Sequence, residues 1–370
     1  NRSGLPVPVL HIDAGHNYNQ ESREAVYAWF GKWLLGIEDE EKLEEEPYTV
    51  EDEEDLLVFA EREVPDTGID WDSLTELLIE QAESRLADLQ PTSPSELIEF
   101  KKLMEPALRH AIGAENPSPD EIEFQRWGRT KRGDYTIHQA TLGRKSEDEQ
   151  FFVTFYVPEN ADYANPATVL VHPEGKQFFI NKGEAEPGEL IQALLREGHI
   201  VAAMDPFLTG EYHTPWKETT RDTSERFFTV YNLTDHACRV QDILTLVSFL
   251  EGEYYAESVN LVGLDKAGVW CLLARGLAPE IDALAVDAGD VDFLEDEAWM
   301  EDLFIPVIRR VGDIETAVTL AAPARLLVGH ADGVVDMEAV RTLYSNVAER
   351  PDIQVKRTAL STREIADWLD

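Results

Sequence analysis

The sequence predicts an α/β domain built on a mostly parallel sheet with helices on both faces. Two observations lead to this prediction. From residue 127 onward, apolar runs of strand length alternate with segments of helical periodicity. One of these runs leads through a short glycine-flanked turn, residues 263–268, into an apolar helix. With 370 residues, of which 43% are hydrophobic, the chain can bury a large core.

The expected elements of this region follow in chain order. Strands are predicted at 135–142, 151–157, 167–172, 199–204, 259–262, 284–286, 324–328 and 353–356, and the first two are expected to pair antiparallel. Helices are predicted at 190–197, 235–250, 269–277 and 337–348, and a last helix begins at Thr362. Ser361 and Glu364 have the spacing of a capping box, which marks the start of that last helix.

The chain ahead of this region begins with a separate strand–loop–helix pattern. Val7–Ile12 is predicted to be a buried strand, and a loop over Asp13–Asn19 follows it. A helix is predicted over Ser22–Leu35, capped by Asn19, with Val26, Phe30, Trp33 and Leu34 on its apolar face. We expect three parts in the chain: this tail at 1–45, an acidic and helical linker at 46–115 with helices at 74–89 and 96–112, and the α/β domain at 116–370.

A short internal repeat connects the two ends of the chain. Ser22-Arg23-Glu24 begins the first helix and Thr362-Arg363-Glu364 begins the last one. Each helix comes shortly after a predicted strand. The shared strand–loop–helix context favours a duplicated domain over a chance match.

The charge excludes several classes of partner. The chain has 73 Asp and Glu against 32 Lys and Arg, a formal net charge of −41. Binding to nucleic acid or to anionic membranes needs clustered cations, so neither is expected. The acidic surface is typical of salt adaptation, although an acidic surface without special meaning explains it as well. Cys238 and Cys271 form no metal motif or disulfide framework, and no cofactor is expected.

The turn Gly263-Leu264-Asp265-Lys266-Ala267-Gly268 has the pattern of a nucleophile elbow. Such an elbow normally presents Ser or Cys at its apex, and here the apex is Asp265. The pattern therefore predicts the fold more strongly than it predicts the chemistry.

The loop after the first predicted strand contains the best candidate for a catalytic histidine, His16. In hydrolases with this type of elbow, the chain order is nucleophile, acid, histidine, and the histidine lies in a loop after the last strand. His16 could act as general base for a nucleophile and an acid ahead of residue 1, or it could be a hydrogen-bonded loop residue.

The predicted domain at 116–370 has no histidine in the corresponding loop, Arg357–Leu360. Asp332 and Asp336 lie in the region of the usual acid and are expected to be turn and cap residues. Asp265 could still act as a nucleophile that opens an epoxide or displaces a halide. Such a reaction needs a base, for which His330 and His16 are the candidates. Lys266 could favour the ionised Asp265, or could form an exposed ion pair.

Two further loops are expected at the edge of the sheet where the strands end. His172-Pro173-Glu174-Gly175-Lys176 has the position of an oxyanion loop, in which Glu174 and Gly175 would face the substrate, although a simple strand-end turn explains it better. The second loop is Asp205–Glu211. Both loops would border the same crevice, because ligands in open α/β sheets bind at the carboxyl ends of the strands.

The His16 loop, the helix after it, the 172–176 loop and the elbow together resemble the acetyl xylan esterase-like branch of the α/β-hydrolases. They are most similar to long bacterial proteins with two such domains in tandem. The resemblance covers residues 7–35 and the chain from Tyr135 onward. It implies an α/β-hydrolase fold, ester hydrolysis on acylated carbohydrate, His16 as the catalytic histidine of a first domain, and a secreted or periplasmic location.

The resemblance leaves three functions open for this chain. The domain at 116–370 could be non-catalytic and support an esterase domain, in the same or another chain, or its carbohydrate substrate. It could instead be an active hydrolase that uses Asp265. A third alternative is a structural interaction module.

Overall fold

The computed structural model describes residues 9–161, 165–181, 186–213, 220–253, 256, 258–289, 292–293 and 295–370. The chain divides into two compact units, residues 1–71 and residues 72–370.

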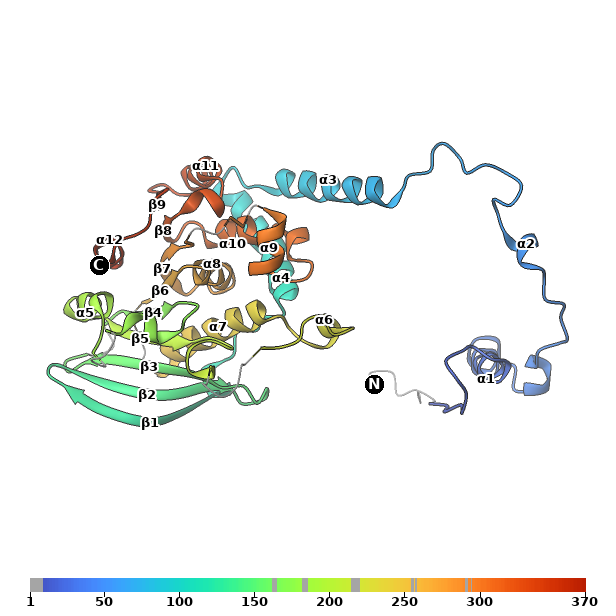
Figure 1. Ribbon diagram of the computed structural model, residues 1–370, viewed down its shortest axis with the longest axis horizontal. Coiled ribbons are helices and arrows are strands. Elements are labelled where there is room, and N and C mark those ends of the chain that lie inside the picture. Colours follow the sequence, from blue (N-terminus) through green and yellow to red (C-terminus); the bar gives the residue numbers. More distant parts are fainter. Residues whose placement is uncertain are drawn as a thin grey trace. The chain divides into compact units, whose positions relative to one another are not determined.

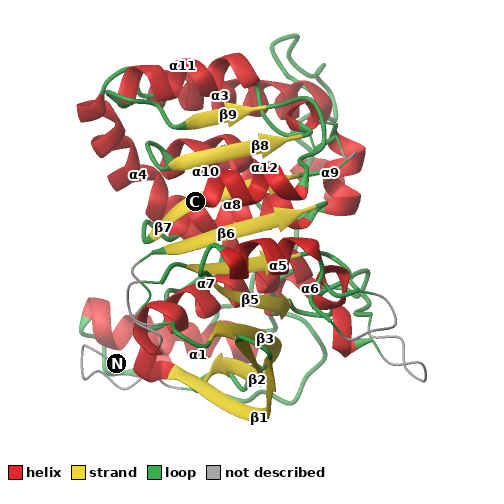
Figure 2. Ribbon diagram, turned by 90° about the vertical axis from the view of Figure 1, so that its left-hand side faces the viewer, coloured by secondary structure: helices red, strands yellow, loops and turns green. Residues whose placement is uncertain are grey.

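The larger unit is built on a nine-stranded sheet with the order β1-β2-β3-β5-β4-β6-β7-β8-β9 (Figure 2). The strands are β1 Ile122–Arg132, β2 Tyr135–Arg144, β3 Phe151–Pro158, β4 Ala167–Val171, β5 Ile200–Asp205, β6 Val259–Leu264, β7 Ile281–Asp287, β8 Arg325–Gly329 and β9 Ile353–Val355. The pairs among β1, β2, β3 and β5 are antiparallel, and the pairs from β5 through β4 to β9 are parallel. The carboxyl ends of six parallel strands therefore meet at one edge of the sheet.

Helices cover both faces of this sheet. The helices described from residue 71 onward are α3 Trp71–Leu89, α4 Pro94–Ile112, α5 Glu189–Arg196, α6 Phe228–Tyr231, α7 Asp235–Glu253, α8 Ala267–Leu277, α9 Asp296–Asp302, α10 Asp313–Ala321, α11 Met337–Val347 and α12 Thr362–Leu369. Short 3-10 turns occur at Pro119–Glu121, Lys176–Phe179, Gly210–Tyr212, Ile308–Val311 and Ala331–Gly333. Figure 1 shows α5 and α12 on one face of the sheet, and α4, α7, α8 and α10 on the other.

The central strands are buried on both faces, as expected for parallel strands between two helical layers. Every residue of β4 and β5 is buried. The larger core cluster packs one sheet face against α4, α7 and α8, and the smaller one packs the other face against α5 and α12. The predicted α/β-hydrolase fold, with a mostly parallel sheet and helices on both faces, is confirmed.

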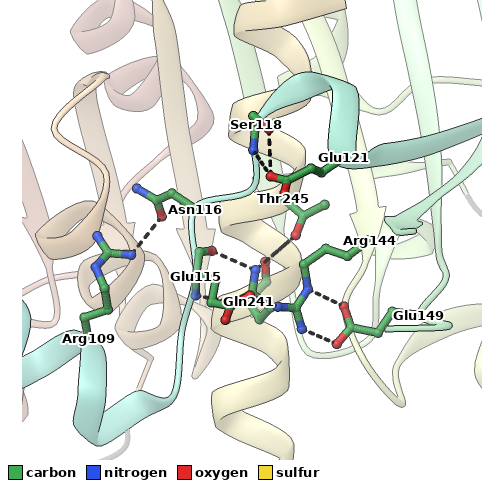
Figure 3. Close-up of polar contacts among 9 residues, drawn as sticks. All are labelled: Arg109, Glu115, Asn116, Ser118, Glu121, Arg144, Glu149, Gln241 and Thr245. Atoms are coloured by element: carbon green, nitrogen blue, oxygen red, sulfur yellow. Dashed lines mark hydrogen bonds and ion pairs between the residues drawn. The ribbon is translucent and has the colours of Figure 1, made fainter. Parts of the chain in front are cut away.

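Helix α4 belongs to the core of this unit. Its apolar residues Leu97, Phe100, Met104, Leu108 and Ile112 are buried. Beyond the helix, the backbone of Glu115 exchanges two hydrogen bonds with the Gln241 side chain of α7, at 2.7 and 2.9 Å (Figure 3). Arg144 of β2 reaches the Glu115 carboxylate at 2.9 Å. These contacts join α4 and residue 115 to the α/β sheet, within the compact unit Asp72–Asp370.

The smaller unit is helical where it is described. It contains α1 Gln20–Phe30, which continues as a π-helix over Gly31–Leu35, a 3-10 turn at Glu40–Leu43 and α2 Glu53–Leu56. Asn19 caps α1 as predicted, because its side chain accepts the Ser22 N–H at 3.0 Å.

The strand predicted over Val7–Ile12 is not formed at residues 9–12, and residues 7 and 8 lie outside the described chain. Val9 is 92% exposed. A single extended segment needs a neighbouring strand to satisfy its backbone, and the described part of this unit has no strand.

The other predicted strands and helices are present with small shifts at their ends. The sequence did not indicate β1, α9 or α10. No helix in the described part of the chain is long and apolar enough to cross a membrane.

Candidate active site

The elbow predicted around Asp265 is formed. β6 ends at Leu264, α8 begins at Ala267, and Asp265 has a left-handed backbone with φ of 57°. A residue other than glycine is strained in that region, and such strain is concentrated at functional turns. The turn is tight enough to require glycine at position 263, because a Cβ there would lie 2.7 Å from the Ala267 carbonyl oxygen.

The turn itself binds the Asp265 carboxylate. The Lys266 backbone N–H donates to Asp265 Oδ1 at 2.6 Å. In an acyl-transfer enzyme, the amide of the residue after the nucleophile stabilises the oxyanion of the tetrahedral intermediate. The Lys266 ammonium forms an ion pair with Asp302 of α9. Lys266 therefore contacts Asp265 through its backbone, and its side chain has the ion-pair role that the sequence left open.

Asp287 and His330 form a pair near the elbow. Asp287 is the last residue of β7 and His330 follows β8, so both lie at the same sheet edge as Asp265. Nδ1 of His330 lies 2.5 Å from Oδ1 of Asp287. The backbone N–H of Leu360, in the loop where the triad histidine was sought, donates to Oδ2 of Asp287 at 2.6 Å.

Gly289 lies between this pair and the elbow. Its N–H donates to Asp287 Oδ1 at 3.1 Å, and a Cβ on it would lie 3.2 Å from Asp265 Oδ1. The structure thus brings a carboxylate at the elbow, a second carboxylate and an imidazole into one small region. Asp287 was missed from the sequence, where its only signal was an aspartate at the end of an apolar strand.

Asp332, in the usual acid region, has a different partner. Its Oδ1 lies 3.4 Å from Nε of Arg357, and both side chains are more than half exposed. Arg357 belongs to the loop in which a triad histidine would be expected. Asp336 caps α11 through the N–H groups of Glu338 and Ala339.

The 172–176 loop has its backbone donors engaged. Pro173 has no N–H, and the N–H of Glu174 donates to Nδ1 of His172 at 3.0 Å. The Gly175 N–H donates to the His172 carbonyl at 2.8 Å, and the Lys176 N–H donates to Asp205 Oδ1 at 2.7 Å. These amides are therefore occupied within the loop and cannot bind an oxyanion in this arrangement.

A buried ion pair joins this loop to the Asp205–Glu211 loop. The Lys176 ammonium pairs with Asp205, which is fully buried, and with Glu211 at 2.6 Å. Gly175 has φ of +76°, and a Cβ on it would lie 2.3 Å from Asp205 Oδ1. The ion pair holds together the two loops that were expected to border one crevice. Lys176 and Gly175 therefore have structural roles.

Two histidines, the buried His172 and the partly buried His236, lie within electrostatic range of the elbow. Burial lowers the pKa of His172, against the opposing charges of Asp265 and Glu174. Burial, with the charges of Arg239 and Lys266, lowers the pKa of His236 to about 3. His236 Nδ1 accepts the Trp270 indole N–H at 3.0 Å, which a neutral ring can do. His236 was not singled out from the sequence.

His16 lies in the smaller unit, in an exposed bend ahead of α1. Asp265, His330, Asp332, Glu174, Gly175 and Lys266 all lie in the larger unit. Cys271 is fully buried, and burial raises its pKa well above the usual value, so it is a core residue. Among the described residues, no group of three or more His, Cys, Asp or Glu is placed to hold a metal ion.

The strand order, the elbow and the helices on both faces define an α/β-hydrolase fold. No protein-family model matches the sequence. A search of curated proteins found no match either.

Solved structures share the fold at low sequence identity. A Bacteroides fragilis protein with a provisional assignment as an acetyl xylan esterase is 15% identical, with a TM-score of 0.58 over 80% of this chain and 84% of that one. Acetyl xylan esterase 1 from Thermoanaerobacterium sp. is 15% identical, with a TM-score of 0.45 over 76% of this chain and 96% of that one. A glucuronoyl esterase from Solibacter usitatus is 12% identical, with a TM-score of 0.47 over 71% and 90%.

Proposed function

We propose that residues 116–370 act as a non-catalytic α/β-hydrolase domain that supports an esterase domain or its acylated carbohydrate substrate. The observation that carries this proposal is the hydrogen bond from the Lys266 N–H to Asp265 Oδ1. A carboxylate oxygen holds the site that the oxyanion of an ester would need. The engaged amides of the 172–176 loop support the same conclusion, since they leave no second donor there.

The smaller unit supports the idea of a partner esterase domain. Helix α1 and the π-helix that continues it keep apolar side chains exposed, including Phe30 at 48% and Leu34 at 71%. Exposed apolar side chains along one helix are typical of a surface that packs against another domain. His16 precedes this helix, and we propose it as the general base of that esterase domain.

Hydrolysis of 4-nitrophenyl acetate by the whole chain tests the non-catalytic role. We expect no turnover above the buffer rate for the wild type, for Asp265→Ala or for His330→Ala. Turnover by the wild type that disappears in Asp265→Ala would contradict the proposal.

A second candidate function rests on the Asp287–His330 pair. His330 presents Nδ1 to a carboxylate, which is how a general base is oriented in a hydrolase. Asp265 Oδ2 would attack a saturated carbon of an alkyl halide, forming a C–O bond as the carbon–halogen bond breaks and halide departs, or of an epoxide, whose opened oxygen takes a proton from water. His330 would then take a proton from the water that attacks the Asp265 ester carbon, and would return that proton to the alkoxide, which leaves as the alcohol. The oxyanion formed at Oδ1 would lie on the Lys266 N–H.

Halide release from 1-bromobutane tests this candidate. If Asp265 is a nucleophile, the wild type should release bromide and Asp265→Asn should not, because an amide is a poor nucleophile. An absence of release from the wild type favours the non-catalytic role.

A further inference from the structure

A cavity of about 480 Å³ lies at the edge of the sheet opposite to the edge that carries Asp265. It is lined by the β1–β2 turn, the end of β3 at Pro158 and helix α5. β3 runs antiparallel to β5, with Phe152 opposite Asp205 and Tyr156 opposite Val201. Pro158 is therefore beside the amino end of β5, far from the elbow edge. A volume of this size is within the range of small-molecule sites, about 300–1,000 Å³.

The cavity has both hydrogen-bond donors and acceptors. Its polar lining consists of Arg132, Asp134, Tyr135, Glu186, Gln192 and Arg196. In the described part of the chain, the side chains of Arg132, Glu186 and Arg196 and the hydroxyl of Tyr135 have no hydrogen-bond or ion-pair partner. Arg132 and Arg196 are both exposed at the cavity. Their guanidinium groups are free to donate to a ligand.

The framework around these groups is fixed. The Asp134 carbonyl accepts the Glu159 N–H at 2.8 Å, which holds the turn against the end of β3. The Gln192 amide donates to the Pro187 carbonyl at 2.7 Å, which leaves its oxygen as an acceptor. The Glu186 carbonyl accepts the Asn181 N–H at 2.9 Å. These contacts fix the backbone at Asp134 and Glu186 and the side-chain amide of Gln192.

Tyr135 provides an apolar face within the same cavity. Its ring packs beside Tyr156 at a centroid distance of 6.3 Å, and Tyr156 is buried. The pKa of Tyr135 is raised by burial and by Glu186, and Arg132 opposes this. Arg132 and Glu186 line the same cavity as this ring. An anchored aromatic ring with polar groups around its edge suits a ligand with one apolar face and many hydroxyls.

We propose that this cavity binds a neutral saccharide, with the C–H face of a sugar ring on Tyr135. Arg132 and Arg196 donate to sugar oxygens, and Asp134 and Glu186 accept from sugar hydroxyls. Two positive and two negative side chains give no formal excess of charge, so neither an anion nor a cation is favoured. The inference rests on the proposed function only in sharing carbohydrate as the ligand, and it uses different residues at a different edge.

Isothermal titration calorimetry with xylotriose, cellotriose and the anionic trigalacturonate tests the assignment on the whole chain. We expect at least one neutral trisaccharide to bind. Arg132→Ala and Arg196→Ala should each weaken it about tenfold, the value of a lost hydrogen bond to a charged group. Arg129→Ala is the matched control, because Arg129 is exposed on β1 opposite His138, outside the cavity lining.

Three results would overturn the assignment: no binding of either neutral sugar, binding that survives both arginine substitutions, or binding of trigalacturonate alone. Both arginines are exposed, so thermal melts of the variants should match the wild type. Ester hydrolysis is measured separately, so loss of this site leaves the proposed role of the elbow untouched, and the reverse also holds.

Discussion

His330 and Asp287 meet at 2.5 Å at the carboxyl edge of the sheet, but each comes one strand earlier than a hydrolase triad requires. His330 follows β8, where the acid usually lies, and Asp287 ends β7. The later loop offers Arg357 to Asp332 and the Leu360 N–H to Asp287. An acid and a histidine are thus present at this edge, but on other strands than in a hydrolase triad. The Lys266 amide at the elbow already donates to the Asp265 carboxylate.

The Lys176 ion pair should be the strongest polar contribution to stability near this edge. Lys176→Met leaves the buried Asp205 without its cation, and we expect the free energy of unfolding to fall by about 3–5 kcal/mol. Urea denaturation measures the change. Lys102→Met is the control, because its pair with Glu99 is exposed and should contribute about 0–1 kcal/mol. Equal losses in the two variants would show that burial of the Lys176 pair has no special weight.

Helix α4 should contribute to global stability as a core helix does. Leu108 is fully buried, and Leu108→Ala should lower the free energy of unfolding by about 2–5 kcal/mol. Leu103 on the same helix is 55% exposed, so Leu103→Ala should change stability by about 0.5 kcal/mol or less. Guanidinium unfolding followed by circular dichroism compares the two. A neutral Leu108→Ala would place α4 in a linker, as the sequence predicts.

His236 should make the fold less stable in mild acid. Its pKa is about 3 in the folded chain against an unperturbed 6.5, so between these values the unfolded chain binds a proton that the folded chain does not. Stability from this residue is complete above pH 6.5 and is lost as the pH falls. At pH 5 the loss is about 2 kcal/mol.

The variant His236→Gln keeps an acceptor for Trp270 and removes the titration. Between pH 7.5 and 5, urea unfolding should show about 2 kcal/mol more loss for the wild type than for this variant. Parallel pH profiles would mean that His236 does not titrate between the two states.

Salt should stabilise the whole chain. A net charge of −41 opposes the compact state by self-repulsion, and raising the ionic strength from about 0.1 to 1 M shortens the Debye length from about 10 to 3 Å. We expect the melting temperature to rise with KCl in differential scanning calorimetry. Sucrose at equal osmolality is the control for non-ionic effects. A melting temperature that is insensitive to KCl, or that falls, would argue against a salt-adapted surface.

The sequence predicted the parallel sheet well because buried strands and amphipathic helices leave local patterns. The elbow was readable for the same reason, since Gly263, Asp265 and Gly268 are close along the chain. The antiparallel partner β1 was missed because it is an edge strand with mostly exposed side chains, which weakens its alternation.

The contacts of the candidate site could not be predicted in this way. Asp287 and His330 are 43 residues apart, and their pairing depends on where two strands end in space. The bond from Lys266 to Asp265 is local, but it depends on a left-handed φ that the sequence does not encode in its periodicity. The prediction of a strand at 7–12 was wrong at residues 9–12. This segment is apolar, but the described part of its unit has no second strand with which it could pair.

In the proposed non-catalytic role, Asp265 is bound at the elbow and does not act as a nucleophile. Single-turnover incubation of excess protein with styrene oxide or 1-bromobutane in ¹⁸O-water, followed by mass spectrometry of the peptide containing Asp265, distinguishes this role from catalysis. We expect Asp265 to stay unlabelled and the substrate to remain unconsumed. Incorporation of ¹⁸O into the Asp265 carboxylate, absent in His330→Ala, would show instead that the domain is an active hydrolase.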